Sequence, residues 1–270
     1  MIKLVVSDVD GTLVKDGTLE INLEYMDVIK KLRKKEIYFA VCSGRQYSSE
    51  SQLFAPVKDQ IFFVSDGGTL IRTSEKILKI HTLPDEIWKN MAKMVKTELP
   101  ECDYFISGPD RCFAEDSKSK MFRWLRDSYG YDIREVPDMM HLEGEQIMKI
   151  AVYHQEQCEE LCAPVFTPYW KDKINLAAAG KEWMDSTPPE GEKSTAVEFI
   201  QQQLGISLEE TCTFGDNLND IAMLQKAGMS YAVANARAEV QTAAREVCPS
   251  YSEDGVLQIL KGIVSESGKQ

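Results

Sequence analysis

The sequence predicts an α/β protein, in which a doubly wound parallel sheet of Rossmann-like topology carries an inserted α/β domain. Short apolar runs, typical of strands buried on both faces, alternate with amphipathic helical segments near the N-terminus and again after residue 188. The stretch between these regions lacks that rhythm. A length of 270 residues suffices for one large domain or two modest ones.

The first part of the chain alternates strand and helix signals. Apolar runs at Ile2–Val6, Ile37–Cys42 and Ile61–Val64 predict buried parallel strands. Glu24–Lys35, between the first two, has its apolar residues at helical spacing. Strand, helix and strand in this order favour βαβ units. Thr69–Thr82 then predicts two short strands around a turn.

The middle of the chain mixes helices and strands, and we assign residues 83–187 to a cap domain inserted into a core of residues 1–82 and 188–270. Its expected elements are a helix after Pro84, strands near Tyr104–Ser107 and Arg111–Glu115, a helix over Lys118–Tyr129 and a strand over Met148–His154. Prolines near Leu83–Pro84 and Thr187–Pro189 make these segments plausible hinges.

The alternation returns in the last part of the chain. Lys193–Leu204 predicts a helix closed by Gly205, and Ile221–Ala227 a helix closed by Gly228. Thr211–Phe214 and Tyr231–Ala234 predict the accompanying strands. This region therefore completes the core sheet.

The charge of the chain limits its partners. With 31 basic and 43 acidic residues the net charge is −12, which disfavours binding to nucleic acid or anionic membranes. An anionic small molecule remains possible if a metal ion or local cations reverse the field at its site. The apolar N-terminal run is too short for a signal peptide. The seven cysteines form no CxxC pair, so we expect a reduced, cytoplasmic protein.

Four polar segments carry the candidate chemistry. They are Asp8-Val9-Asp10-Gly11-Thr12-Leu13, Cys42-Ser43-Gly44-Arg45, Glu192-Lys193-Ser194 and Gly215-Asp216-Asn217-Leu218-Asn219-Asp220. The first, second and fourth directly follow apolar strands. Ligands of open α/β sheets bind at the carboxyl ends of strands, so these loops could converge on one crevice.

The residue types of these segments favour phosphoryl transfer. Carboxylates at Asp8, Asp10 and Asp216 would repel one another unless a hard cation lay among them, and Mg²⁺ suits such oxygen ligands. A metal would also let the Asp8 carboxylate approach a phosphate as a nucleophile. Asp10 could serve as general acid and base.

Donors for the phosphoryl oxygens are available in the other segments. Ser43 offers a hydroxyl group, Gly44 a backbone N–H and Lys193 an ammonium group. Gly11 permits close backbone approach. Arg45 could contact the phosphate or leaving group, although a surface ion pair is an equal alternative.

These motifs, in this order, resemble those of the haloacid dehalogenase superfamily, specifically the Cof-type phosphatases with a large α/β cap. The resemblance implies that Asp8 is the nucleophile, Asp10 the acid/base, and Ser43 and Lys193 the phosphoryl-holding residues. It implies Mg²⁺ binding by Asp8, the Asp10 main-chain carbonyl and Asp216. Asn219 and Asp220 would support this site or touch the phosphate. We group Asp220 with the metal-binding residues. We group Asn219, Gly44 and Arg45 with the substrate-binding residues.

The sequence departs from the family pattern at two points. Ser194 follows Lys193 where the family usually has glycine, and Asp66-Gly67-Gly68 stands where Asn-Gly is common. Neither departure removes a catalytic group.

The resulting hypothesis is a magnesium-dependent phosphatase of small phosphorylated metabolites, such as sugar phosphates, with an aspartyl-phosphate intermediate. A phosphomutase and a non-catalytic metabolite-binding protein are the alternatives. We interpret the tryptophans, Trp124 and Trp183 among them, as core or domain-interface residues. The substrate and oligomeric state stay open.

Overall fold

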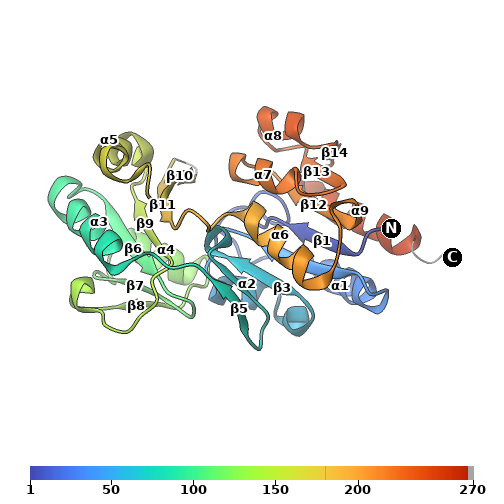
Figure 1. Ribbon diagram of the computed structural model, residues 1–270, viewed down its shortest axis with the longest axis horizontal. Helices are drawn as coiled ribbons and strands as arrows, with labels where there is room; N and C mark the ends of the chain where they lie inside the picture. Colours follow the sequence, from blue (N-terminus) through green and yellow to red (C-terminus); the bar gives the residue numbers. More distant parts are fainter. Residues whose placement is uncertain (180, 267–270) are drawn as a thin grey trace.

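Two β-sheets, each with helices packed against it, form the computed structural model, which describes residues 1–179 and 181–266 (Figure 1). The larger sheet has the strand order β14-β13-β12-β1-β2-β3-β4-β5, and the smaller has β10-β11-β9-β6-β7-β8. In the larger sheet β14 to β3 pair in parallel, while β4 and β5 add an antiparallel edge. The predicted fold class is therefore confirmed.

The core contains the first and the last described residues of the chain. Its elements are β1 (Leu4–Ser7), α1 (Glu24–Lys34), β2 (Tyr38–Cys42), α2 (Tyr47–Leu53), β3 (Phe62–Ser65), β4 (Leu70–Arg72), β5 (Ile77–Ile80), α6 (Lys193–Leu204), β12 (Thr211–Gly215), α7 (Ile221–Leu224), β13 (Met229–Val233), α8 (Ala238–Ala243), β14 (Glu246–Cys248) and α9 (Gly255–Glu266). The strands predicted here are present. The prediction that α7 extends to Ala227 is wrong, because Gly228 instead donates its N–H to the Leu208 carbonyl (2.6 Å) in the approach to β13.

The cap is the smaller lobe, at the left of Figure 1. Its elements are α3 (Asp85–Glu98), β6 (Asp103–Ser107), β7 (Cys112–Ala114), α4 (Lys120–Asp127), β8 (Ile133–Glu135), β9 (Lys149–Tyr153), α5 (Cys158–Trp170), β10 (Asn175–Ala179) and β11 (Trp183–Thr187). The predicted insert of residues 83–187 spans these elements, and its exact limits stay a prediction. The sequence reasoning missed α5, β8, β10 and β11.

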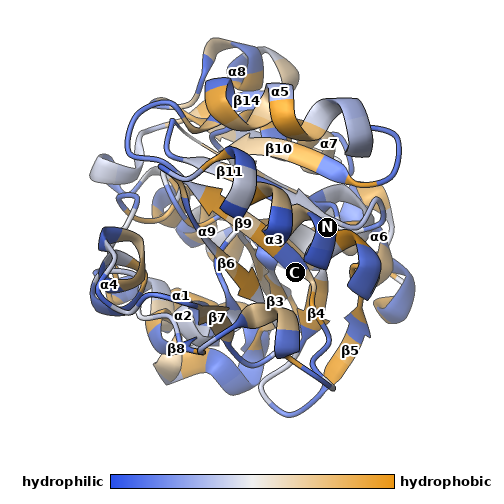
Figure 2. Ribbon diagram, turned by 90° about the vertical axis from the view of Figure 1, so that its left-hand side faces the viewer, coloured by the Kyte–Doolittle hydropathy of each residue, from blue (hydrophilic) through white to orange (hydrophobic). Residues whose placement is uncertain are grey.

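Alternate side chains of β1 show why the core sheet is buried on both faces. Val5 packs in the apolar cluster beneath α1 and α9, whereas Leu4 and Val6 pack in the cluster beneath α6. Apolar segments lie mainly along the strands and the inner faces of helices (Figure 2). No helix in the described ranges is long and apolar enough to cross a membrane.

The cap sheet also has two different faces. Tyr104 and Ile106 of β6 pack in the apolar cluster with α3 and α5, while Phe105 packs with α4 on the opposite face. The face that carries Phe105 contributes to a cavity shared with the core. The alternation along β6 thus separates the structural face of the cap from the face that meets the core.

A buried ion-pair network joins the cap to the core. The ammonium group of Lys149, on β9 of the cap, lies 2.9 Å from Asp66 and 3.4 Å from Asp185. It also donates to the Gly44 carbonyl at 2.9 Å, and the Ser107 hydroxyl donates to Asp66 at 2.9 Å. Asp66 and Gly44 belong to the core. The aspartate that departs from the family pattern is therefore a partner for a lysine of the cap.

The backbone after β3 explains the glycines that follow Asp66. Asp66 itself adopts φ 48°, a left-handed conformation that aspartate tolerates better than most residues. Gly68 has φ 114°, and a Cβ atom there would collide with the backbone of Glu192. This close approach places the turn directly beside the start of α6.

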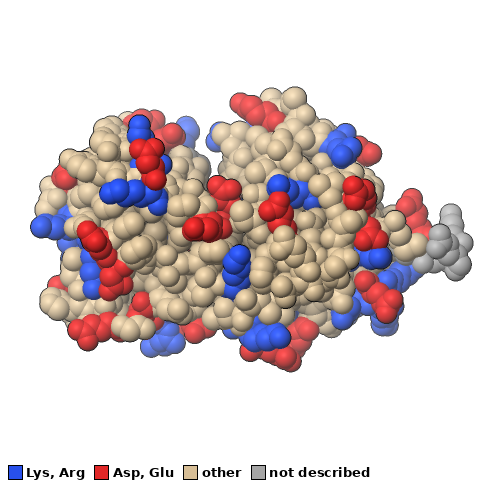
Figure 3. Space-filling model, viewed as in Figure 1, with Lys and Arg blue, Asp and Glu red and all other residues tan. Residues whose placement is uncertain are grey.

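Further polar contacts hold the cap against the core. The Tyr129 hydroxyl donates to Asp16 at 2.6 Å, and Gln52 donates to the Gly130 carbonyl at 2.6 Å. Arg72 pairs with Asp110 at 3.1 Å. The cap is thus seated on the core along several of its segments, and a notch between the lobes is visible at the top of Figure 3.

Replacing Lys149 by methionine should strongly destabilise the protein. Asp66 and Asp185 would lose their shared cation, and breaking a buried ion pair from one side costs about 3–5 kcal/mol. The free energy of unfolding, measured by chemical denaturation, should fall by that amount.

Lys96→Met is the matched control, because Lys96 forms a more exposed ion pair with Glu115 inside the cap (2.7 Å). It should cost no more than about 1 kcal/mol. Adding Asp66→Asn to Lys149→Met should recover part of the loss by removing one unpaired buried carboxylate. Equal losses in the two single variants would contradict this account.

Candidate active site

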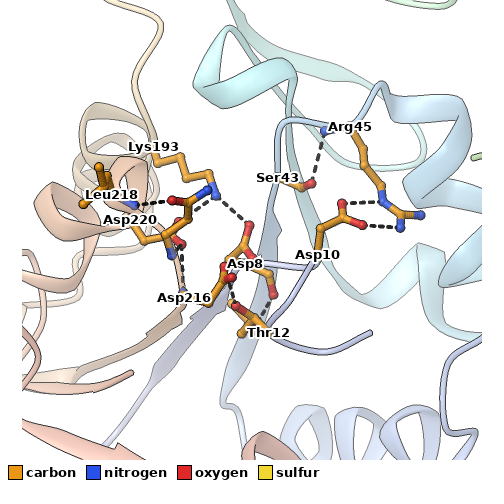
Figure 4. Close-up of polar contacts among 11 residues, drawn as sticks. Asp8, Asp10, Thr12, Ser43, Arg45, Lys193, Asp216, Leu218 and Asp220 are labelled. Atoms are coloured by element: carbon orange, nitrogen blue, oxygen red, sulfur yellow. Dashed lines mark hydrogen bonds and ion pairs between the residues drawn. The ribbon is translucent and has the colours of Figure 1, made fainter. Parts of the chain in front are cut away.

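Loops from neighbouring parallel strands meet at one edge of the core sheet. Asp8 follows β1, Ser43 follows β2 and Asp216 follows β12, and β12, β1 and β2 are adjacent in the sheet. Lys193, the first residue of α6, reaches the same place (Figure 4). The structure thus brings together the four segments that the sequence singled out, while the roles of their residues stay predictions.

Lys193 is the buried cation of this cluster. Its ammonium group lies 2.6 Å from Asp8 Oδ1 and 2.7 Å from Asp220 Oδ1. The other oxygen of Asp220 accepts the backbone N–H groups of Asp216 and Asn217, both at 3.0 Å. With both oxygens engaged, Asp220 positions Lys193 and the loop after β12; the predicted direct contact between Asp220 and a metal stays untested.

The carboxylates of Asp8, Asp216 and Asp220 form a group with the donor set of a metal site. One oxygen from each lies within 4.8 Å of the others. Asp8 Oδ2 is buried and has no hydrogen-bond partner among the described residues. Such hard oxygen donors fit Mg²⁺, and a cation there would provide the missing partner.

The pKa values of these carboxyl groups reflect their crowding. Burial, together with the neighbouring Asp220 and Asp216, raises the pKa of Asp8 well above its ordinary value, although Lys193 opposes this. Burial and then Asp220 raise the pKa of Asp216 to about 7. A divalent cation would relieve this electrostatic cost.

The position next to the Asp216 carboxylate requires a glycine. Gly11 has φ 76°, and a Cβ atom there would collide with the Asp216 carboxylate. The Thr12 hydroxyl also donates to Asp216, at 3.4 Å. The turn after β1 therefore packs directly against the loop after β12.

Asp10 is held by Arg45 in a two-pronged ion pair. Arg45 Nε donates to Asp10 Oδ2 at 2.7 Å, and Nη2 donates to Oδ1 at 2.6 Å (Figure 4). Arg45 is only 1% exposed, and it also donates to the Thr18 carbonyl and lies over the Tyr129 ring. Arg45 therefore does form an ion pair, but not at the surface, because its guanidinium group is buried and the Asp10 side chain is 22% exposed. A contact between Arg45 and substrate stays a prediction.

Ser43 and Gly44 form the turn after β2. The Ser43 hydroxyl accepts the Arg45 N–H at 3.1 Å, and Gly44 accepts the hydrogen bond from Lys149 of the cap. A Cβ atom added to Gly44 would meet no other atom within 4 Å. Since Gly44 lines the cavity, that open space is available to a ligand.

A cavity of about 300 Å³ lies between core and cap. On the core side it is lined by the catalytic candidates Asp8, Asp10, Ser43 and Lys193 and by the substrate-binding candidate Asn219. Its remaining wall includes aromatic rings of the cap, and the rings of Trp124 and Trp183 stack with their centroids 5.8 Å apart. Trp124 and Trp183 thus lie where the cap meets the core, in agreement with the expected interface position, and both line the cavity.

Sequence reasoning missed several lining residues. They are Asp16, Phe105, Leu125, Tyr129, Tyr131, Lys149, Ala179, Glu182 and Asp185. No motif marks them, and all except Asp16 belong to the cap, whose packing on the core brings them to the cavity. On the outer face shown in Figure 3, acidic and basic side chains are interspersed. The cavity, by contrast, brings charged groups together, of which Asp8, Arg45, Lys149 and Lys193 are buried.

Comparison with known proteins identifies the family of the chain. A family model described as haloacid dehalogenase-like hydrolase matches residues 5–260. Two 5-amino-6-(5-phospho-D-ribitylamino)uracil phosphatases are each 24% identical to the chain. The match to YbjI of Escherichia coli covers 97% of this chain and 96% of YbjI. The match to YcsE of Bacillus subtilis covers 96% of this chain and 95% of YcsE. A crystal structure from Eubacterium rectale is 53% identical, with a TM-score of 0.88, and covers 97% of this chain and 99% of its own.

The four motifs, their convergence at one sheet edge and the match along almost the whole sequence have one explanation: the chain belongs to the haloacid dehalogenase-like hydrolase family.

Proposed function

We propose that this protein hydrolyses phosphate monoesters of small metabolites, using Mg²⁺ and a phosphorylated Asp8 intermediate. The observation that carries the proposal is the state of Asp8. One of its oxygens is fixed by Lys193 at 2.6 Å, while the other is buried without a hydrogen-bond partner among the described residues, and Asp8 lines the same cavity as Asp10. The phosphatase names of the two curated relatives support the same activity.

The first half of the reaction transfers the phosphoryl group to the enzyme. An oxygen of Asp8 attacks phosphorus, and the bond between phosphorus and the leaving alcohol breaks. Asp10 gives its proton to the leaving oxygen. This role needs Asp10 as a carboxylic acid at the start of the reaction, whereas the paired hydrogen bonds from Arg45 orient its carboxylate form at the cavity.

The second half returns the enzyme to its initial state. Asp10, now ionised, takes a proton from water as the water oxygen attacks phosphorus. The bond between phosphorus and Asp8 breaks, which releases inorganic phosphate and restores the Asp8 carboxylate. Lys193, Ser43 and Gly44 hold the phosphoryl oxygens in both halves, so charge is stabilised by groups already in place.

Mg²⁺ bound by Asp8, Asp216 and the Asp10 main-chain carbonyl would supply positive charge that reduces repulsion between the phosphate and Asp8. Residues 83–187 would act as the cap, and its closure over the core would exclude water during phosphorylation. The contacts of Lys149 and Tyr129 with the core support such a closed arrangement.

Asp8→Asn should abolish turnover, because an amide cannot serve as the nucleophile. Release of inorganic phosphate from a panel of phosphate monoesters should fall by at least about a thousandfold. Asp59→Asn, a change at an exposed aspartate of the core, is the matched control and should leave the rate unchanged. Wild-type turnover by Asp8→Asn would show that another group attacks the phosphate.

Removal of divalent metal should silence the enzyme. After dialysis against EDTA the crowded carboxylates lack their compensating cation, so phosphate release should stop and return when Mg²⁺ is added. Because a ligand of the folded state stabilises it, Mg²⁺ should also raise the melting temperature of the dialysed protein. Full activity after exhaustive dialysis, with no change in melting temperature on adding Mg²⁺, would refute the metal requirement.

A further inference from the structure

The cap wall of the cavity combines aromatic rings with carboxylates. Phe105 and Trp183 contact edge to face with centroids 5.8 Å apart, and Trp183 also stacks on Trp124. Glu182 and Asp185 flank Trp183 on the same segment, and both line the cavity. Because these residues line the same cavity as Asp8, a phosphate ester with its phosphorus at Asp8 would have this wall available to its leaving group.

The cations that line the cavity already have carboxylate partners. Within the described ranges, Arg45 is paired with Asp10, and Lys193 with Asp8 and Asp220. Lys149, the lining cation contributed by the cap, lies between Asp66 and Asp185. None of them is left over to neutralise an additional anion on the leaving group.

Carboxylates outnumber cations on the side of the cavity formed by the cap wall. Glu182 accepts the Lys181 backbone N–H at 3.2 Å, and no ion pair to Glu182 occurs in residues 1–179 and 181–266. Asp16 of the core adds a third carboxyl group to the cavity, where it accepts the Tyr129 hydroxyl. The leaving-group side therefore offers acceptors and an apolar surface.

We propose that the leaving group of the substrate is neutral or cationic, carries hydroxyl or amine donors, and has an apolar face that packs on the rings. A second phosphate or a carboxylate on the substrate is excluded. This inference rests on the proposed function, since it assumes that the phosphate end of the substrate lies at Asp8.

Both the charge and the burial of this wall disfavour a second anionic group on the substrate. A second anionic group would be desolvated between the rings and placed against carboxylates, without a free cation. A hydroxyl or amine group would instead donate to the carboxylate of Glu182 or Asp16. Carbon-bound hydrogens of the same leaving group would cover the rings of Trp124 and Trp183.

The same constraint separates the hydrolase from the phosphomutase alternative. A mutase that passes through a sugar bisphosphate must hold a phosphate at each end of its ligand. The cap wall described above opposes the second phosphate, so the inference favours the hydrolase over the phosphomutase.

Sorbitol 6-phosphate and 6-phosphogluconate test the inference, because they differ only in a terminal CH₂OH against a carboxylate. Their affinities would be measured by calorimetry with the Asp8→Asn protein in a magnesium-containing buffer, so that neither ligand is turned over. Sorbitol 6-phosphate should bind at least about tenfold more tightly, since juxtaposed like charges cost a factor of this order or more.

Glu182→Gln in the same Asp8→Asn background should narrow that ratio by raising affinity for 6-phosphogluconate. Glu101→Gln is the matched control, because Glu101 is an exposed cap carboxylate outside the cavity lining, and it should leave the ratio unchanged. Equal affinities, tighter binding of 6-phosphogluconate, or binding of neither compound would overturn the inference. Phosphate release by the wild-type enzyme is measured separately, so a failure of the proposed function is recognised independently.

Discussion

The electrostatic crowding of carboxylates at the ends of β1 and β12 is the constraint on which the site depends. Asp8, Asp216 and Asp220 offer oxygens within 4.8 Å of one another in a largely buried place. Such an arrangement is costly unless cations lie among the carboxylates. Lys193 provides one of them by spanning Asp8 and Asp220, and the pKa values of Asp8 and Asp216, raised by burial, mark where more positive charge is needed.

The same rule operates through the rest of the cavity. Arg45 is held by Asp10, and Lys149 lies between Asp66 and Asp185. Each pair also fixes geometry: the first orients the proposed acid/base, and the second ties the cap to the turn that contains Gly44. Charges that would be costly to bury singly are thus held in pairs, and these pairs position the groups that we propose to react.

The core and its candidate site could be predicted because their signals are local in sequence. Parallel strands buried on both faces appear as short apolar runs, and the polar residues at their carboxyl ends must share one sheet edge. Asp8, Ser43 and Asp216 were identified in this way. Lys193 was not distinguishable from a surface lysine except by its order among the other motifs, yet it is 4% exposed.

The cap was harder to predict because its signals conflict or depend on packing. Pro164 and Pro168 lie inside α5, where proline normally argues against a helix. Buried residues at intervals of four, from Cys158 to Trp170, nevertheless pack this helix on the cap sheet. β10 has no clear apolar alternation, and half-exposed alanines carry little strand signal.

The lining residues of the cap were missed for a different reason. The link between Asp66 and Lys149 joins residues far apart in the chain, so the departure at Asp66 had no interpretation until the two domains were seen together. Glu182 and Asp185 likewise become relevant only when β11 faces the core. Residues that act together only across the boundary between cap and core do not form a recognisable motif in the sequence of either part.

The central claim is that Asp8 attacks the phosphate, and trapping the intermediate tests it most directly. Enzyme mixed with a phosphate ester that it hydrolyses would be quenched in acid during turnover and digested, and its peptides analysed by mass spectrometry. The account predicts a phosphoryl group on the peptide that contains Asp8, lost when the peptide is treated with hydroxylamine, which cleaves acyl phosphates. A phosphoryl group on another residue, or phosphate release with no phosphorylated peptide at any time point, would contradict it.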